Sequence, residues 1–413
     1  MTHASEAARA AERVARDSYG RLVAFLAART RDVAGAEDAL GEAFAAALRT
    51  WPLDGVPDNP DAWLLTVARR RQTDMARRQR TRQAGEGQLT LMADELEAAA
   101  LDAGDIPDRR LALMFACAHP AIDKGMRAPL ILQTILGLTA EEIASAFLIP
   151  PATMSQRLVR AKTRIRDAGI PFAVPEREEL SERLQSVLDA IYAAYAKGWN
   201  EIGEAGVPEI ADEALWLGKL VVSLLPAEPE AKGMLALMLY AEARRRARRD
   251  DSGAYVPLEE QNVSLWDDSQ ISRAERLLHE ANASGPSGRY QLEAAIQSAH
   301  VARRTTGAPT WPAVVELYDH LLELTGSPVV RLNRAVAVAE VEGAAAALAA
   351  IAPLENDRRM RDYQPYWAAR AHLLARLGRR GEAREAFTVA VGLTSDEAVR
   401  SYLNARRAAL TEA

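Results

Sequence analysis

Side chains able to recognise nucleic acid gather in one short stretch of the chain. Between residues 153 and 166 it carries hydrogen-bonding and cationic groups, namely Thr153, Ser155, Gln156, Arg157, Arg160, Lys162, Arg164 and Arg166. Arg and Gln have the geometry to read base edges, and the other cations suit phosphates. A second basic cluster comprises Arg69, Arg70, Arg71, Arg77, Arg78, Arg80 and Arg82. The chemistry indicated is non-covalent binding of DNA.

The elements that would position the first cluster are two short helices. Thr139 followed by Glu142 forms a capping box, which predicts that a helix starts there. Pro150 and Pro151 end this helix near Phe147 to Leu148, yet proline is tolerated in the first turn of the next. Apolar residues of the second helix recur at helical spacing as an inward stripe of Met154, Leu158, Ala161 and Ile165.

A helix-turn-helix presents such a second helix to the DNA major groove. A solvated basic helix in any α-helical bundle is the alternative interpretation. The combination of capping box, turn length and charge favours DNA binding. The stretch T-A-E-E-I-A-x-x-F-x-I-P-x-x-T-x-x-Q-R-L-x-R-A-K resembles the promoter-binding C-terminal module of bacterial RNA polymerase sigma factors of the extracytoplasmic-function type. By this resemblance Thr153, Ser155, Gln156, Arg157, Arg160 and Lys162 bind the minus-thirty-five element.

An amphipathic helix is predicted from about Ala36, with an apolar set of Ala39, Leu40, Ala43, Phe44, Ala47 and Leu48. Taken alone, its acidic side is an ordinary solvated face. However, A-E-D-A-L-x-E-A-F-x-x-A-L resembles the sigma helix that docks on the clamp helices of core RNA polymerase. The resemblance implies that Asp38, Glu42 and Phe44 bind polymerase. Gly41 departs from the glutamine usual in the family.

A third helix is predicted to follow, with Asn59 as its N-cap and Pro60 as its first residue. Its sequence resembles the family signature W-L-x-x-I-A-R-N-x-x-x-D-x-x-R-R, which lies along the minus-ten element. The resemblance assigns DNA binding to Trp63, Arg69, Arg70, Asp74, Arg77 and Arg78, although Arg70 replaces the usual asparagine. Trp63 is equally compatible with a plain core position.

The domain organisation follows from these resemblances and from composition. Residues 1–82 correspond to sigma region 2, residues 83–107 to an acidic linker, and residues 108–172 to sigma region 4. Residues 173–413 are predicted to form an α-helical C-terminal regulatory domain. In it, Trp367, Ala371, Leu374, Gly378, Ala383, Phe387 and Ala390 fall at tetratricopeptide offsets, with weaker copies upstream. This region resembles the extension of one sigma-factor group with such repeats, whose groove suits a helix or peptide partner.

Composition supports an all-α fold and limits the functions open to the chain. Ala and Leu dominate the 413 residues, 49% of which are hydrophobic and only 6% aromatic. The single Cys117 excludes a disulfide framework and suits a reducing cytosol. Cys117 and His119 are predicted to pack locally rather than bind a metal. The N-terminus lacks a signal-peptide core and no stretch is long and apolar enough to span a bilayer, so a cytoplasmic protein without a membrane partner is expected.

The prediction is therefore a sigma factor that binds core RNA polymerase and promoter DNA, with its C-terminal domain regulating it in cis. The alternative is a helix-turn-helix regulator with a tetratricopeptide-like sensor or protein-binding domain, which needs no polymerase-docking helix. An enzyme is disfavoured because no phosphate loop, metal cluster or nucleophile motif is present. No catalytic residue, metal site or cofactor is predicted.

Overall fold

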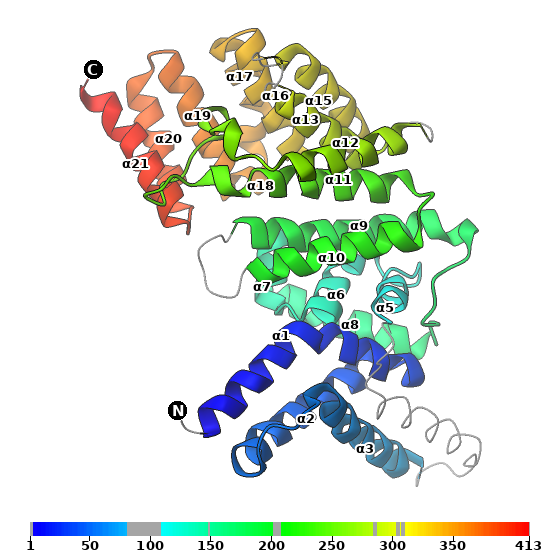
Figure 1. The fold of residues 1–413 in the computed structure, drawn as a ribbon. Helices are drawn as coiled ribbons and strands as arrows, with labels where there is room; N and C mark the ends of the chain where they lie inside the picture. Colours follow the sequence, from blue (N-terminus) through cyan, green and yellow to red (C-terminus); the bar gives the residue numbers. More distant parts are fainter. Residues whose placement is uncertain are drawn as a thin grey trace. The chain divides into compact units, whose positions relative to one another are not determined.

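A computed structural model describes residues 3–80, 109–147, 149–200, 208–283, 287–302, 306 and 310–412. These residues form helices joined by turns and one isolated antiparallel bridge between Arg249 and Tyr255 (Figure 1). The predicted all-α fold is confirmed. The acidic linker at 83–107 lies outside the described residues. The chain divides into two compact units, Met1–Lys197 and Gly198–Ala413.

The first three helices form what we call the N-terminal module: α1 (His3–Thr30), α2 (Val33–Asp54) and α3 (Pro60–Arg80). Asp32 caps α2 by accepting a hydrogen bond from the Gly35 backbone N–H at 3.1 Å, so α2 begins three residues before the predicted start. Asn59 caps α3 through the Ala62 N–H at 3.1 Å, as the sequence predicts. Each helix of this module contacts the other two.

The next four helices form the helix-turn-helix module: α5 (Arg110–Cys117), α6 (Lys124–Leu136), α7 (Ala140–Phe147) and α8 (Pro151–Asp167). The capping box is present, because Glu142 Oε2 accepts from the Thr139 N–H at 2.8 Å and Thr139 Oγ1 accepts from the Glu142 N–H at 3.2 Å. The predicted inward stripe of α8 is buried.

The first unit also includes most of α9 (Arg177–Asn200). The buried Arg183 guanidinium donates to the backbone carbonyl of Phe115 in α5, and Arg127 pairs with Glu182 at 2.9 Å. Further along, Lys197 lies 3.5 Å from Glu142 in α7. These contacts attach α9 to the helix-turn-helix module, so residues 173–197 fold with the first unit. The sequence placed the start of the C-terminal domain at residue 173 instead.

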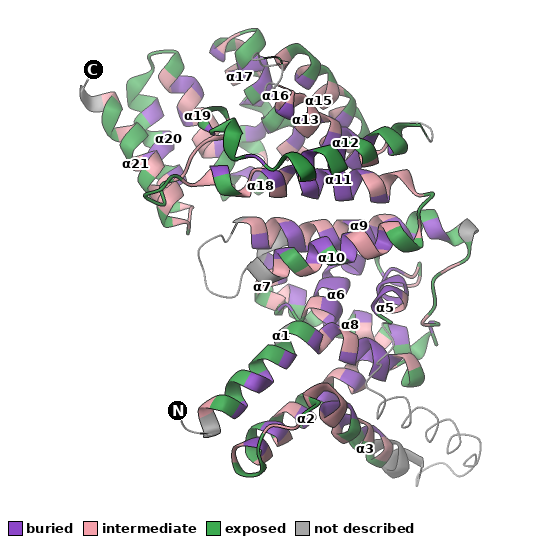
Figure 2. Cartoon of the chain, in the orientation of Figure 1, coloured by how far each residue is buried: buried purple, intermediate pink, exposed green. Residues whose placement is uncertain are grey.

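The second unit starts with α10 (Pro208–Leu224), α11 (Pro229–Ala243), the short helices η1 (Arg245–Arg248), η2 (Leu258–Glu260) and η3 (Val263–Leu265), α12 (Asp268–Asn282) and α13 (Arg289–Val301). Most of α11 is buried (Figure 2). The arginine run after it is held by ion pairs: Arg245 pairs with Glu242 at 2.6 Å, and Arg249 pairs with Asp396 at 2.6 Å. The run therefore links the end of α11 to the loop before α21 within this unit.

The rest of the second unit consists of α15 (Trp311–Thr325), α16 (Pro328–Val341), α17 (Ala344–Ile351), η4 (Ala352–Asn356), α18 (Arg358–Arg361), α19 (Gln364–Arg376), α20 (Arg380–Gly392) and α21 (Glu397–Glu412). Neighbouring helices pack in sequence order, and α19 and α20 share a core that contains Ala371, Leu374, Ala383 and Phe387. Gly378 has a φ of 72° at the turn between them. A helical hairpin thus forms where the repeat pattern is clearest.

Candidate nucleic-acid and polymerase interfaces

The outer face of α8 carries most of the residues predicted to bind the upstream element. Ser155, Gln156, Arg157 and Arg160 are exposed, and Thr153 is half-buried. They reach this face because the buried stripe anchors the opposite side of the helix. The sequence analysis did not include Val159, which lies on the same face and is 63% exposed. Its position could have been found by projecting the helix from the inward stripe.

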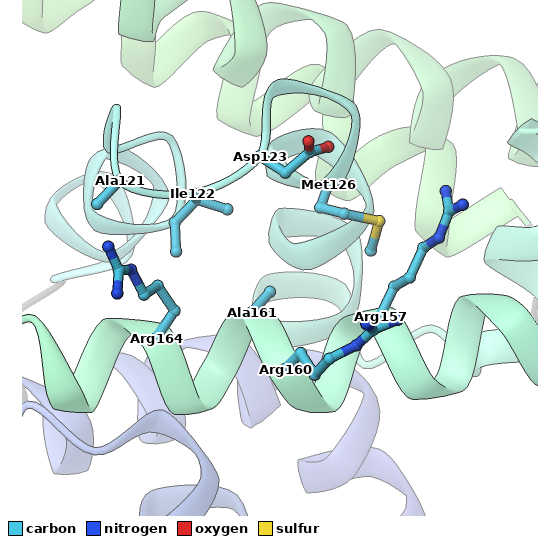
Figure 3. A pocket seen from close by; sticks show the side chains of 8 residues that line it. All are labelled: Ala121, Ile122, Asp123, Met126, Arg157, Arg160, Ala161 and Arg164. Atoms are coloured by element: carbon cyan, nitrogen blue, oxygen red, sulfur yellow. The ribbon is translucent and has the colours of Figure 1, made fainter.

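Three arginines of α8 line one side of an open pocket of about 670 Å³. Arg157, Arg160 and Arg164 face the α5–α6 connection, where Ile122 and Asp123 lie. Figure 3 shows Arg164 extending from α8 toward Ala121 and Ile122, and Arg157 extending beside Met126 of α6. Three guanidinium groups on one edge of the helix concentrate positive charge that suits a phosphate backbone.

Lys162 points to a different side of α8 and forms an ion pair with Glu37 of α2. Its side chain is only 13% exposed and that of Glu37 15%. Burial raises the pKa of the Glu37 carboxyl, and the Lys162 charge offsets this only in part. Glu37 Oε1 is buried without a hydrogen-bond partner. The predicted contact between Lys162 and DNA stays a prediction, and in this arrangement the ammonium group is engaged by Glu37.

The predicted minus-ten helix, α3, presents Arg70 and Asp74 to solvent. Arg69 lies over the Phe25 ring, 4.9 Å from its centroid. Trp63 is half-buried and packs edge-on against Trp51, with 5.5 Å between ring centroids. Its packing is compatible with a positioning role beside DNA. The side chains of Arg77 and Arg78 lie outside the described part of the structure.

The predicted docking helix, α2, exposes Asp38 and Glu42 and leaves Phe44 half-buried. Leu48 was assigned to the apolar core set, but it is 52% exposed, one to two turns beyond Glu42 on the helix surface. Glu42 pairs with Arg71 at 3.1 Å in an exposed ion pair. The outer face of α2 therefore presents Asp38 and Glu42 together with the exposed Arg49, and Leu48 adds an exposed apolar residue in the C-terminal half of the helix.

The two modules pack against each other within the first unit. Helix α1 contacts α5 and α6, and α2 contacts α8. A Cβ atom on Gly20 of α1 would overlap the backbone carbonyl oxygen of Ile135 in α6, so only glycine permits this approach. Tyr19 packs against Gly137, whose φ of 66° forms the C-cap of α6. The Glu37–Lys162 pair is thus part of an extended contact.

The described residues contain no cluster of three potential metal ligands. Cys117 Sγ and Thr134 Oγ1 share a hydrogen bond of 3.6 Å, and His119 Nδ1 accepts from the Ala121 N–H at 3.1 Å. Among the helices that the structure describes, none is both long enough and apolar enough to cross a membrane.

Comparison with known proteins identifies parts of both units. Residues 14–82 match the family Sigma-70 region 2, and residues 183–282 match a family of unknown function, DUF6596. The chain is 40% identical over 375 residues to the uncharacterized protein R00370 of Rhizobium meliloti (strain 1021), a match that covers 89% of this chain and 88% of that protein. No solved structure matches the chain.

The region 2 match identifies a transcription initiation factor, and the Sigma-70 family is non-enzymatic. The chain belongs to the sigma factors of the extracytoplasmic-function type that carry a C-terminal helical extension, and it shares nearly its whole length with the R00370 protein. Its partners are core RNA polymerase and promoter DNA, and its role is promoter-specific transcription.

Proposed function

We propose that this sigma factor docks on core polymerase through the outer face of α2, binds the minus-ten element along α3 and reads the minus-thirty-five element with α8. The exposed face of α8, with Gln156, Arg157 and Arg160 opposite a buried stripe, is the observation that carries the proposal. A recognition helix needs this separation between an anchored side and a reading side. On α2, the exposed side chains available for contact with the polymerase include Asp38, Glu42 and Leu48.

The proposal requires the two modules to separate before they bind a promoter. The two elements are centred about 25 base pairs apart, which is about 85 Å at 3.4 Å per base pair. In the structure, α8 contacts α2 and α2 contacts α3. Packed helices lie about 8–10 Å apart, so α3 and α8 come within about 20 Å of each other. The packed arrangement is therefore a closed form that cannot bind both elements on one straight duplex.

We further propose that residues 198–413 regulate this sigma factor in cis. Helix α9 is bonded to the helix-turn-helix module through Arg183, Glu182 and Lys197, and it leads directly into the second unit. A domain attached in this way acts at a high effective concentration on its neighbours. A movement of the second unit would be transmitted through α9, whose Lys197 pairs with Glu142 in α7.

Run-off transcription on fragments of the source genome tests the initiation role. Core polymerase with the full-length protein is expected to give discrete transcripts that core polymerase alone does not give. If the protein neither binds core polymerase nor yields a transcript, it is a helix-turn-helix regulator, the alternative left open by the sequence.

Removal of the second unit tests regulation in cis. We expect a protein that ends at Lys197 to give about 5- to 150-fold less transcript than the full chain, the usual range of coupling between sites. Both proteins are compared on one promoter with the same core polymerase, at equal concentration and salt. The cut follows Lys197 so that the contacts of Arg183 and Glu182 are retained.

Circular dichroism and thermal unfolding of the shortened protein provide the control. A helical protein with a cooperative transition shows that loss of transcript does not come from loss of the first unit's fold. Equal transcript from both proteins would rule out regulation in cis and leave the second unit as a platform for another protein.

A further inference from the structure

An apolar side chain stands in the middle of the DNA-reading face of α8. Val159 is 63% exposed, and it is the one large apolar side chain of that helix that is exposed. A single exposed valine is ordinary on a protein surface. Its neighbours distinguish this one, because Gln156 precedes it by one turn and Arg160 follows it directly.

The outer face of α8 has a regular pattern around this valine. Ala152, Gln156, Val159 and Thr163 recur at intervals of four, three and four residues, which places them in one straight row along the helix. The row carries no charge. On one side of it Arg157, Arg160 and Arg164 line the pocket described above, and on the other side lie Ser155, Lys162 and Arg166. A helix in the major groove suits this arrangement, because the central row faces the bases, the long side chains of Arg157 and Arg160 beside it reach base edges, and the outermost cations meet phosphates.

We propose that Val159 recognises the C5-methyl group of a thymine in the upstream promoter element, an inference that rests on the proposed binding of that element by α8. In the major groove the thymine methyl is the apolar feature that distinguishes base pairs, and apolar side chains read it by contact. Residues one helical turn apart are separated by about 5.4 Å along the axis, compared with 3.4 Å between base pairs. The thymine therefore lies within one or two base pairs of those contacted by Gln156 and Arg160.

The test replaces thymines by deoxyuridine, which removes only the methyl group and keeps base pairing. The probe is a genomic promoter fragment selected by the full-length protein bound to core polymerase. Each thymine of its upstream element is replaced singly, and affinity is measured by competition at fixed salt. We expect one position at which the replacement weakens binding about fourfold, the value of burying one methyl group.

The variant Val159→Ala links that methyl group to this side chain. It should bind the fragment about fourfold less tightly and show no further loss at the sensitive deoxyuridine position. Because Val159 is exposed, the variant should unfold at the same temperature as the wild type. Val336→Ala, which shortens an exposed valine on α16 in the second unit, is the matched control and should keep the full response to deoxyuridine.

Three results would overturn the inference. They are an upstream element insensitive to every deoxyuridine, a Val159→Ala variant with the wild-type response, and a Val159→Ala variant weakened only in binding core polymerase. Replacement of Arg157 and Arg160 then decides whether the proposed function also fails. If this replacement abolishes binding, α8 still binds DNA and only the role of Val159 is lost. Absence of any promoter binding by the polymerase complex would instead remove the proposed function together with this inference.

Discussion

Replacing Arg157 and Arg160 together by alanine is expected to lower the affinity of the polymerase complex for its promoter by about 30-fold to 10⁴-fold. Each arginine that reads a base contributes about 1–3 kcal/mol, and two such losses combine to this range. Both side chains are exposed on the outer face of α8, so their removal leaves the core of the module intact. The measurement is competition binding of the full-length protein with core polymerase at one salt concentration.

The matched control for this double variant is Arg273→Ala with Arg276→Ala on α12. These two arginines are exposed and have the same spacing as Arg157 and Arg160, but they lie in the second unit. Their replacement removes the same amount of charge. Their replacement should leave promoter affinity unchanged. If the two double variants bind equally well, α8 does not read the upstream element through this face.

The second large effect is expected from Lys162→Glu. This change places a second carboxylate against Glu37 in a site where both side chains are largely buried. Breaking a buried ion pair costs about 3–5 kcal/mol, because the remaining charge is left without a partner. Separation of α2 from α8 relieves this cost by returning Glu37 to water. The closed form should therefore open far more often in the variant than in the wild type.

Cys117 reports this opening without any added label. It is the only cysteine of the chain, it is fully buried in α5, and burial raises the pKa of its thiol to about 12. Helix α5 packs on α1, and the charges of Glu37 and Lys162 act on the Cys117 thiol, so we expect the thiol to become reactive when the modules part. We expect a thiol reagent to modify Cys117 about 10² to 5 × 10³ times faster in Lys162→Glu, as the free energy above implies.

Two further variants make this experiment specific. The double exchange Glu37→Lys with Lys162→Glu restores opposite charges and should return the modification rate toward that of the wild type. Arg71→Glu reverses a charge in the exposed pair with Glu42 and should change the rate little, since exposed pairs contribute at most about 1 kcal/mol. Equal rates in Lys162→Glu and the wild type would show that this pair does not hold the modules together.

Local sequence signals predicted the helix-turn-helix well. Thr139 and Glu142 are three residues apart and cap each other, and Asn59 caps the helix that Pro60 begins. Such interactions depend on neighbours in the chain, so the sequence contains the information they need. The inward stripe of α8 likewise follows from helical periodicity alone.

Features set by distant contacts were missed. Lys162 was grouped with the DNA-binding residues because its charge is visible in the sequence, whereas its partner Glu37 lies 125 positions away. Residues 173–197 were assigned to the C-terminal domain because proline residues precede them, but Arg183 reaches Phe115 across 68 positions. Leu48 fits the apolar pattern of α2, yet no neighbouring helix covers it fully. Pattern alone does not reveal which element lies opposite a residue.

The most direct test of promoter-specific initiation is permanganate reactivity of thymines in a selected promoter fragment, since permanganate attacks unpaired thymine. With core polymerase and the full-length protein together, we expect reactive thymines at the minus-ten element and DNA protection over both promoter elements. Neither component alone should produce reactive thymines. Protection of a single site by the protein alone, with no reactive thymine after core polymerase is added, would contradict initiation and identify a regulator that binds duplex DNA.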